Sequence, residues 1–176
     1  MSEPAALYLR LETTQNALDR ALDATLTTRP IDARWEAWWD SRAMYGAGPA
    51  TLPPLGAAQS AREVWEELVD PPERSGRFVE RDTTGIVVGV PLCTENFRHL
   101  IAIAAVLDFL ARSTQATGGH VLVFDAMWGS DDVMLFATLD ASGLHPTTAS
   151  TLGQVNADVV QVASERISRR LDELAP

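Results

Sequence analysis

The sequence predicts one α+β domain over residues 1–176, built on a mainly antiparallel sheet of about five strands. Short apolar or alternating segments suit five strands, longer segments with helical apolar spacing suit five helices, and the chain is long enough to bury a core without a disulfide. The expected order is β-α-α-α-β-β-α-β-β-α. Without the two helices of a tryptophan-rich insertion it reads βαββαβ, the split βαβ or ferredoxin-like plan, which a C-terminal strand and helix extend.

The N-terminal part is expected to form a strand and then a helix. Leucines occupy every second position within residues 7–12, which is typical of a strand with one face in water. Residues 13–26 carry an apolar stripe at helical spacing, and Thr13 or Thr14 is expected to cap that helix. This strand should therefore enter the sheet first, with the helix packed against one of its faces.

A helical insertion is expected over residues 30–72. Asp32 can cap its first helix, Gly46 ends that helix, and a loop rich in proline and glycine follows over 46–58. Ser60 and Glu63 have the spacing of a capping box, which predicts a second helix that ends before two consecutive prolines.

The rest of the chain supplies the other strands and the largest helices. The second strand of a predicted hairpin is apolar on both faces, so it should lie inside the sheet. The helix after it, capped by Thr94, is apolar almost all round and should be the most buried. The predicted segments are the hairpin strands 77–82 and 86–92, the buried helix 94–113, the strands 120–127 and 132–140, and an amphipathic closing helix over 150–174.

The chain is strongly acidic, with a formal net charge of -10. Such a field repels phosphate backbones, so we expect no nucleic-acid partner, whereas a basic partner would be attracted. A surface tuned for solubility would carry a similar charge. No lysine occurs, which excludes Schiff-base and P-loop lysine chemistry, and no arginine occurs between Ser113 and Glu165.

Cysteine content and hydropathy predict a cytoplasmic protein that does not enter a membrane. Cys93 is the single cysteine, so it cannot form an internal disulfide. The first residues lack the basic and apolar regions of a signal peptide. The longest apolar run, 100–107, is too short to cross a bilayer.

Three carboxylates gather in FDAMWGSDDVML, residues 124–135. Asp125, Asp131 and Asp132 lie where two strands connect, so a polar turn is the simplest interpretation. The spacing lacks the alternation and the distal glutamate of a calcium loop, so we expect no metal. Paired acid–base chemistry stays open. A further hypothesis makes this turn a partner-docking tip, with Trp128 as an anchor rimmed by aspartates.

Tryptophans on the first inserted helix raise a second docking hypothesis. Trp35, Trp38 and Trp39 share one helical face, and their spacing is typical of packing against the core. Three rings on a short helix cannot all turn inward fully. We therefore expect Trp39, beside Asp40, to be partly exposed and to join a partner-binding surface.

Catalysis has one candidate nucleophile in the sequence. Cys93 lies between a strand and a helix N-terminus, where a thiol's pKa can fall, but a small apolar core residue is the simpler interpretation. The histidines His99, His120 and His145 lack a signature spacing. We expect no enzyme activity and no cofactor.

The tract RPIDARWEAWW (29–39), followed by AREVWEEL (61–68), resembles a tract in some bacterial immunity proteins of polymorphic-toxin systems. The resemblance implies a cytoplasmic inhibitor of a cognate, secreted toxin. If that toxin is basic, the acidic surface of this chain would attract it. The C-terminal order ββαββα instead resembles acidic type III secretion chaperones, which are dimers that hold another protein. A cysteine-dependent enzyme is the third alternative, and both monomer and homodimer stay open.

Overall fold

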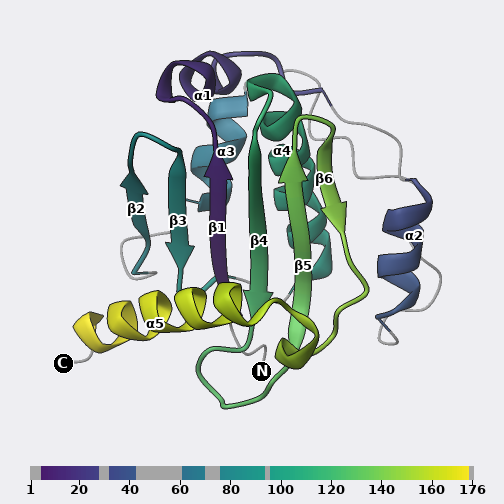
Figure 1. The fold of residues 1–176 in the computed structure, drawn as a ribbon, viewed down its shortest axis with the longest axis vertical. Helices are drawn as coiled ribbons and strands as arrows, with labels where there is room; N and C mark the ends of the chain where they lie inside the picture. The colour runs from purple at the N-terminus through teal and green to yellow at the C-terminus, as the bar shows by residue number, and fades with distance from the viewer. Residues whose placement is uncertain (1–4, 28–31, 43–60, 70–75, 94–95, 175–176) are drawn as a thin grey trace.

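The computed structural model of the chain describes residues 5–27, 32–42, 61–69, 76–93 and 96–174. Within them, the protein is an α+β structure with one six-stranded sheet, helices on both sheet faces and a further helix beside one sheet edge (Figure 1). The strands are β1 (Ala6–Glu12), β2 (Phe78–Arg81), β3 (Ile86–Val90), β4 (Gly118–Phe124), β5 (Val133–Asp140) and β6 (Gly143–Pro146). The helices are α1 (Gln15–Leu22), α2 (Ala33–Asp40), α3 (Ala61–Val69), α4 (Phe97–Thr114), the 3₁₀ turn η1 (Leu152–Gln154) and α5 (Ala157–Leu174).

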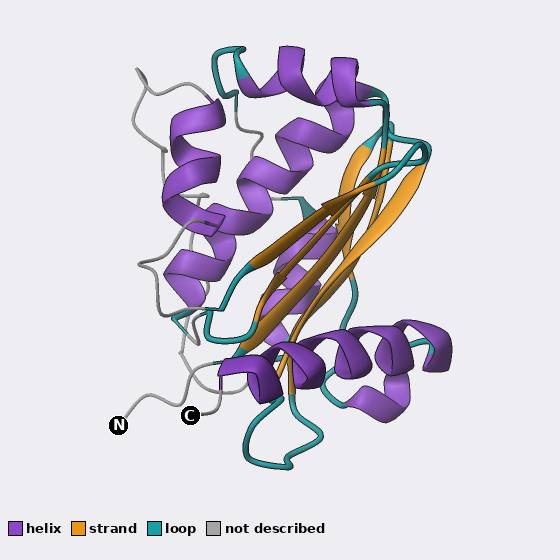
Figure 2. Cartoon of the chain, turned by 90° about the vertical axis from the view of Figure 1, so that its left-hand side faces the viewer, coloured by secondary structure: helices purple, strands orange, loops and turns teal. Residues whose placement is uncertain are grey.

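The sheet has the strand order β2-β3-β1-β4-β5-β6, and every neighbouring pair is antiparallel. Helices α1, α3 and α4 cover one face, whereas α5 crosses the other face near one end of the strands (Figure 2). Helix α2 lies beyond the β6 edge (Figure 1). Tertiary packing therefore leaves α2 at the rim of the sheet.

Two apolar clusters follow from the alternation of side chains along the strands. The larger cluster lies under α1, α3 and α4 and takes the leucines of β1 together with most of α4. The smaller cluster joins Tyr8, Leu122 and Phe124 to Ala163 and Ile167 of α5. Helix α4 supplies many fully buried residues, as its apolar composition predicts.

The sixth strand was not expected from the sequence. Residues 143–146 pair with β5, and the buried Asp108 of α4 accepts a hydrogen bond from the Leu144 N–H at 3.0 Å. The segment is too short to show a period-two pattern. A long-range contact with α4 therefore helps to define the strand.

Three predicted helices are shorter than expected. Helix α1 ends at Leu22 instead of residue 26, since the Ala24 carbonyl accepts from the Ala61 N–H at 3.0 Å. The closing helix does not begin at 150, because the Leu152 N–H bonds to the Asp131 carbonyl and α5 begins only after Asn156. Helix α2 ends at Asp40 with Ser41 as its C-cap.

Several expected features lie outside the described residues: Gly46, the loop 46–58, Ser60, the two prolines after α3, and Thr94. Two expected caps are confirmed where they can be seen. The Thr14 hydroxyl accepts from the Ala17 N–H, and the Asp32 carboxylate accepts from the Arg34 and Trp35 N–H groups. Among the residues seen, no helix combines the length and the apolar character needed to cross a membrane.

Candidate functional site

The connection between β4 and β5, residues 125–132, is called the tip loop here. One carboxylate organises it: Asp125 Oδ1 accepts from the N–H groups of Met127 and Trp128 at 3.0 and 2.9 Å, and Oδ2 accepts from the Ser130 N–H at 3.2 Å. Gly129 supplies a φ of 74° in the same turn. Asp125 therefore acts within the loop, as the turn interpretation expected.

The second half of the loop is fixed through its backbone. The Asp132 carbonyl accepts from the Asp125 N–H at 3.2 Å, and the Asp131 carbonyl accepts from the Leu152 N–H at 2.8 Å. Asp132 also forms an isolated bridge with Thr151. Both aspartate side chains stay exposed on this fixed backbone.

Apolar side chains are exposed between these carboxylates. Trp128 is 61% exposed and Met127 is 46% exposed. A large aromatic ring in water on a hydrogen-bonded loop loses little entropy on binding, and such rings supply much of the energy of protein interfaces. Sequence reasoning had missed Met127, although an apolar pair next to a turn glycine was the available signal.

The surroundings of Asp125 bear on the metal interpretation of the three aspartates. Asp125 already accepts three amide hydrogen bonds, so its oxygens are occupied by the chain itself. Across the described ranges, no group of three or more His, Cys, Asp or Glu residues is placed to hold a metal ion.

Helix α2 carries the second set of predicted contact residues. Trp35 and Trp38 are buried, with 6% and 1% exposure, whereas Trp39 is partly buried and Asp40 is exposed. The rings of Trp35 and Trp39 meet Trp38 edge-on, at centroid distances of 5.6 and 6.1 Å. Trp39 is thus the most exposed of the three rings, as expected.

Arg42 ties the end of α2 to the sheet. Its guanidinium donates to the carbonyls of Val133 and Ala149 and lies 5.8 Å from the centre of the Trp38 ring. Burial lowers the pKa of Arg42 from its usual value. Val133 directly follows the tip loop, so Arg42 links the two predicted contact regions. No local sequence pattern signals this contact.

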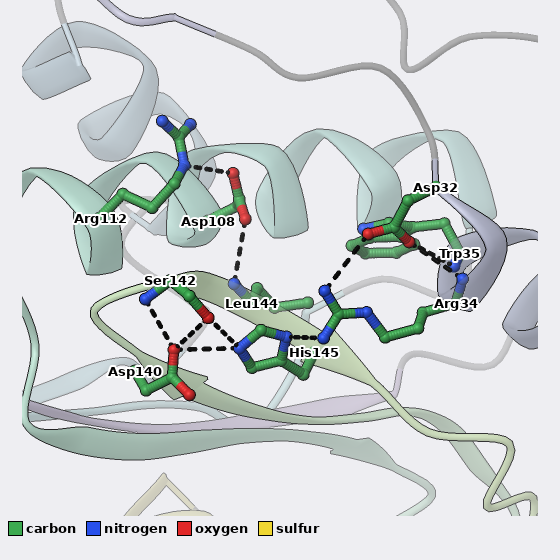
Figure 3. A network of polar contacts seen from close by, with 9 residues as sticks. All are labelled: Asp32, Arg34, Trp35, Asp108, Arg112, Asp140, Ser142, Leu144 and His145. Carbon is green, nitrogen blue, oxygen red and sulfur yellow. Dashed lines mark hydrogen bonds and ion pairs between the residues drawn. The ribbon is translucent and has the colours of Figure 1, made fainter.

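A polar network joins the other end of α2 to the β5–β6 turn (Figure 3). Asp140 Oδ1 accepts from the Ser142 hydroxyl at 2.6 Å and lies 3.0 Å from His145 Nε2. On its other side, His145 Nδ1 meets the Arg34 guanidinium, which also lies 3.4 Å from Asp32. The hydrogen bonds from Ser142, and then His145, hold the pKa of Asp140 well below its usual range.

The residue types of this network are those of a serine hydrolase, but their arrangement is different. A catalytic triad needs a carboxylate on Nδ1 and a serine that can give its proton to Nε2. Here a guanidinium, which can only donate, faces Nδ1, so Nε2 of His145 carries the proton and points to Asp140. The Ser142 hydroxyl also lies 2.9 Å from His145 Nε2, but its proton is directed to Asp140, and the network holds α2 in place (Figure 3).

The surroundings of Cys93 and of the two histidines in the sheet bear on the remaining catalytic candidates. The side chain of Cys93 packs against the larger apolar cluster, which suits its apolar interpretation. His120 stacks on Tyr8 at 5.8 Å, and burial, with a smaller effect of Arg10, lowers its pKa. Strand β5 lies between His120 and His145, which places their backbones roughly 10 Å apart.

Comparisons of the chain with protein-family models, with curated proteins and with solved structures found no match. What bears on function is therefore the exposed Trp128 on a braced acidic loop, and the charge of the chain.

Proposed function

We propose that this chain is a cytoplasmic immunity protein that binds a cognate toxin through the tip loop and neutralises it. The observation that carries the proposal is the 61% exposure of Trp128 beside Met127, with the carboxylates of Asp131 and Asp132 exposed next to them. An aromatic anchor inside a charged rim is the usual composition of an energetic centre at an interface.

The charge of the chain supports a basic partner. The net charge is -10, and the tip loop lies inside the arginine-free stretch between Ser113 and Glu165. A net negative field steers an oppositely charged partner toward the chain and speeds its association. A basic enzyme acting on nucleic acid would have such a surface, and carboxylates could occupy its cationic cleft.

Helix α2 would provide a second contact. Trp39 is partly buried and Asp40 is exposed at the end of α2, which Arg42 fastens near the start of β5. The partner would therefore bind a rigid surface, which loses little conformational entropy when the complex forms.

We also assign the fold to the split βαβ, or ferredoxin-like, plan. The order β2-β3-β1-β4 and the placement of α1, α3 and α4 on one face support this assignment. Strands β5 and β6 and helix α5 then extend that plan.

The test uses the gene neighbourhood. A toxic domain of a large secreted protein encoded beside this gene is expressed in a bacterial host, with and without this chain. Survival is expected with the wild-type chain, and a Trp128→Ala variant should lose protection together with at least about 30-fold in affinity. Val79→Ala is the matched control, because Val79 is also an exposed apolar residue, at 40%, but lies on β2.

Two results would count against the proposal. One is full protection by Trp128→Ala; the other is an obligate homodimer in light scattering together with a secretion-apparatus gene as the neighbour. The second result would favour the acidic secretion chaperone instead.

A further inference from the structure

A small groove lies between β2 and the C-terminal half of α5, on the part of the sheet where α5 crosses the β2 edge (Figure 1). Its volume is about 170 Å³. Two residues of β2 and four of α5 line it: Phe78, Glu80, Arg166, Arg169, Arg170 and Glu173. Three arginines therefore share one groove in a chain that is otherwise strongly acidic.

The floor of the groove is an aromatic ring held in a fixed place. Phe78 pairs with Gly89 on β3, and a Cβ atom added at Gly89 would lie only 2.1 Å from the Phe78 ring. The glycine therefore leaves the space into which the ring folds. Phe78 also packs against the smaller apolar cluster under α5, which fixes it further.

Two of the three guanidinium groups are already oriented by the protein. Arg166 pairs with Glu80 across the groove, and Arg170 donates to the Gly76 carbonyl at 2.9 Å and to Glu173 at 2.6 Å. Arg169 is exposed, and its guanidinium has no hydrogen bond or ion pair with any residue that the structure describes. With three arginines against two glutamates, one positive charge is left uncompensated.

We propose that this groove binds a carboxylate attached to a single ring, with Arg169 as its main cationic partner. A guanidinium presents a planar fork of donors that matches the two oxygens of a carboxylate. One carboxylate carries the single negative charge that the groove lacks, and the ring contacts Phe78. The groove is smaller than the roughly 300–1,000 Å³ of drug-sized sites, so it admits only a small acid or one terminal residue of a peptide.

This inference is independent of the tip loop. The ligand is an anion and the groove lies on α5 and β2, whereas the proposed toxin surface is acidic and lies on the β4–β5 connection. Loss of toxin binding would therefore leave the groove proposal intact, and loss of carboxylate binding would leave the toxin proposal intact.

The experiment is a titration of the ¹⁵N-labelled full chain with benzoate, followed by backbone amide shifts at constant ionic strength. We expect saturable shifts at β2 and the C-terminal half of α5, with a dissociation constant on the order of 1 mM for so small a ligand. Benzamide has the same shape without the charge and should bind far more weakly. N-acetylphenylalanine, a model for a peptide terminus, tests the second source of the same chemistry, and saturation by either acid supports the site.

Three variants distinguish specific binding in the groove from a general effect of the net charge of the chain. Arg169→Ala should weaken benzoate binding about fivefold, as expected for a solvent-exposed ion pair. Glu80→Gln should strengthen it by a similar factor, because it leaves Arg166 uncompensated. Arg20→Ala removes an equal charge from an exposed position on α1 and should change nothing.

The proposal is overturned if neither acid gives saturable shifts in the groove, or if benzamide binds as well as benzoate. It is also overturned if Arg169→Ala and Arg20→Ala behave alike.

Discussion

The Oδ1 atom of Asp108 on α4 accepts a hydrogen bond of 3.0 Å from the backbone N–H of Leu144 on β6. The other oxygen of the same carboxylate accepts from Arg112 Nε at 2.9 Å, and Asp108 is only 5% exposed (Figure 3). A buried charge thus satisfies an amide of an edge strand and an arginine of its own helix.

Replacement of Asp108 by Ala should destabilise the protein by about 2–4 kcal/mol. The change leaves the Leu144 N–H buried without its acceptor and removes the carboxylate that pairs with Arg112, which keeps only its bond to the Thr27 carbonyl. Urea unfolding followed by circular dichroism measures this loss. Asp172→Ala, at an exposed position on α5, is the control and should stay within about 0.5 kcal/mol of the wild type. A loss below about 1 kcal/mol for Asp108→Ala would contradict the role of this contact.

Asp125→Ala should both destabilise the chain and weaken binding of the toxin. Three N–H groups of the tip loop lose their acceptor, which is expected to cost about 1–2 kcal/mol. Trp128 would then sample more conformations and pay more entropy on binding. Asp131→Ala is the comparison, because that side chain is exposed and should leave the unfolding free energy nearly unchanged. Equal stability of the two variants would show that Asp125 does not brace the loop.

Arg42→Ala should loosen α2 from the rim of the sheet. The variant loses the donor to the Val133 and Ala149 carbonyls and the contact with the Trp38 ring. We expect a loss of about 1–3 kcal/mol and a red shift of tryptophan emission as water reaches that ring. Arg20→Ala serves as the control. An unchanged emission maximum in Arg42→Ala would show that Arg42 does not hold α2 against the sheet.

Protonation of His120 should make the fold less stable at mildly acidic pH. Burial lowers the pKa of His120 below its ordinary value of 6.5, so the unfolded chain takes up this proton first as the pH falls. The stability that neutral His120 contributes to the fold is therefore fully present above about pH 6.5. It is lost as the pH falls from there toward the lower pKa of the folded state. Urea unfolding at pH 7, 6 and 5 should show a shallower decline for His120→Gln than for the wild type. Parallel pH profiles would exclude this contribution.

Salt should slow association of the toxin complex if the acidic rim steers it. Between about 50 and 500 mM salt, the association rate constant of the wild-type chain should fall about tenfold or more, with little change in dissociation. A double variant, Asp131→Asn with Asp132→Asn, should show a smaller dependence. Asp172→Asn controls for the loss of net charge away from the tip loop. Stopped-flow fluorescence measures both rates, and a salt-independent association rate would contradict the steering.

Much of the fold could be predicted because local patterns and tertiary packing agree. The period-two leucines of β1 face one cluster, the apolar composition of α4 places it at the centre of the core, and Thr14 and Asp32 cap the expected helices. The other face of β1, expected to be in water, is instead largely buried, because Tyr8 packs in the cluster under α5. Of the candidate site, the turn role of Asp125 and the partial exposure of Trp39 also followed from local chemistry.

The differences arose where a distant backbone group competes with local structure. The Ala24 carbonyl accepts a hydrogen bond from the Ala61 N–H, and the Leu152 N–H donates to the Asp131 carbonyl. Two helices are therefore shorter than their apolar stripes suggest. Helical spacing records which residues can share a face, but not which hydrogen-bonding groups another segment will take.

By itself, the sequence determined the α+β class, the acidic charge, most of the strands and the turn between β4 and β5, because each depends on neighbouring residues or on composition. Only the tertiary structure decided that β6 pairs at the edge, that Arg42 fastens α2 beside the tip loop, and that three arginines meet over Phe78. Each of these contacts joins segments far apart in the chain, and such pairings are fixed by the packing of the whole core.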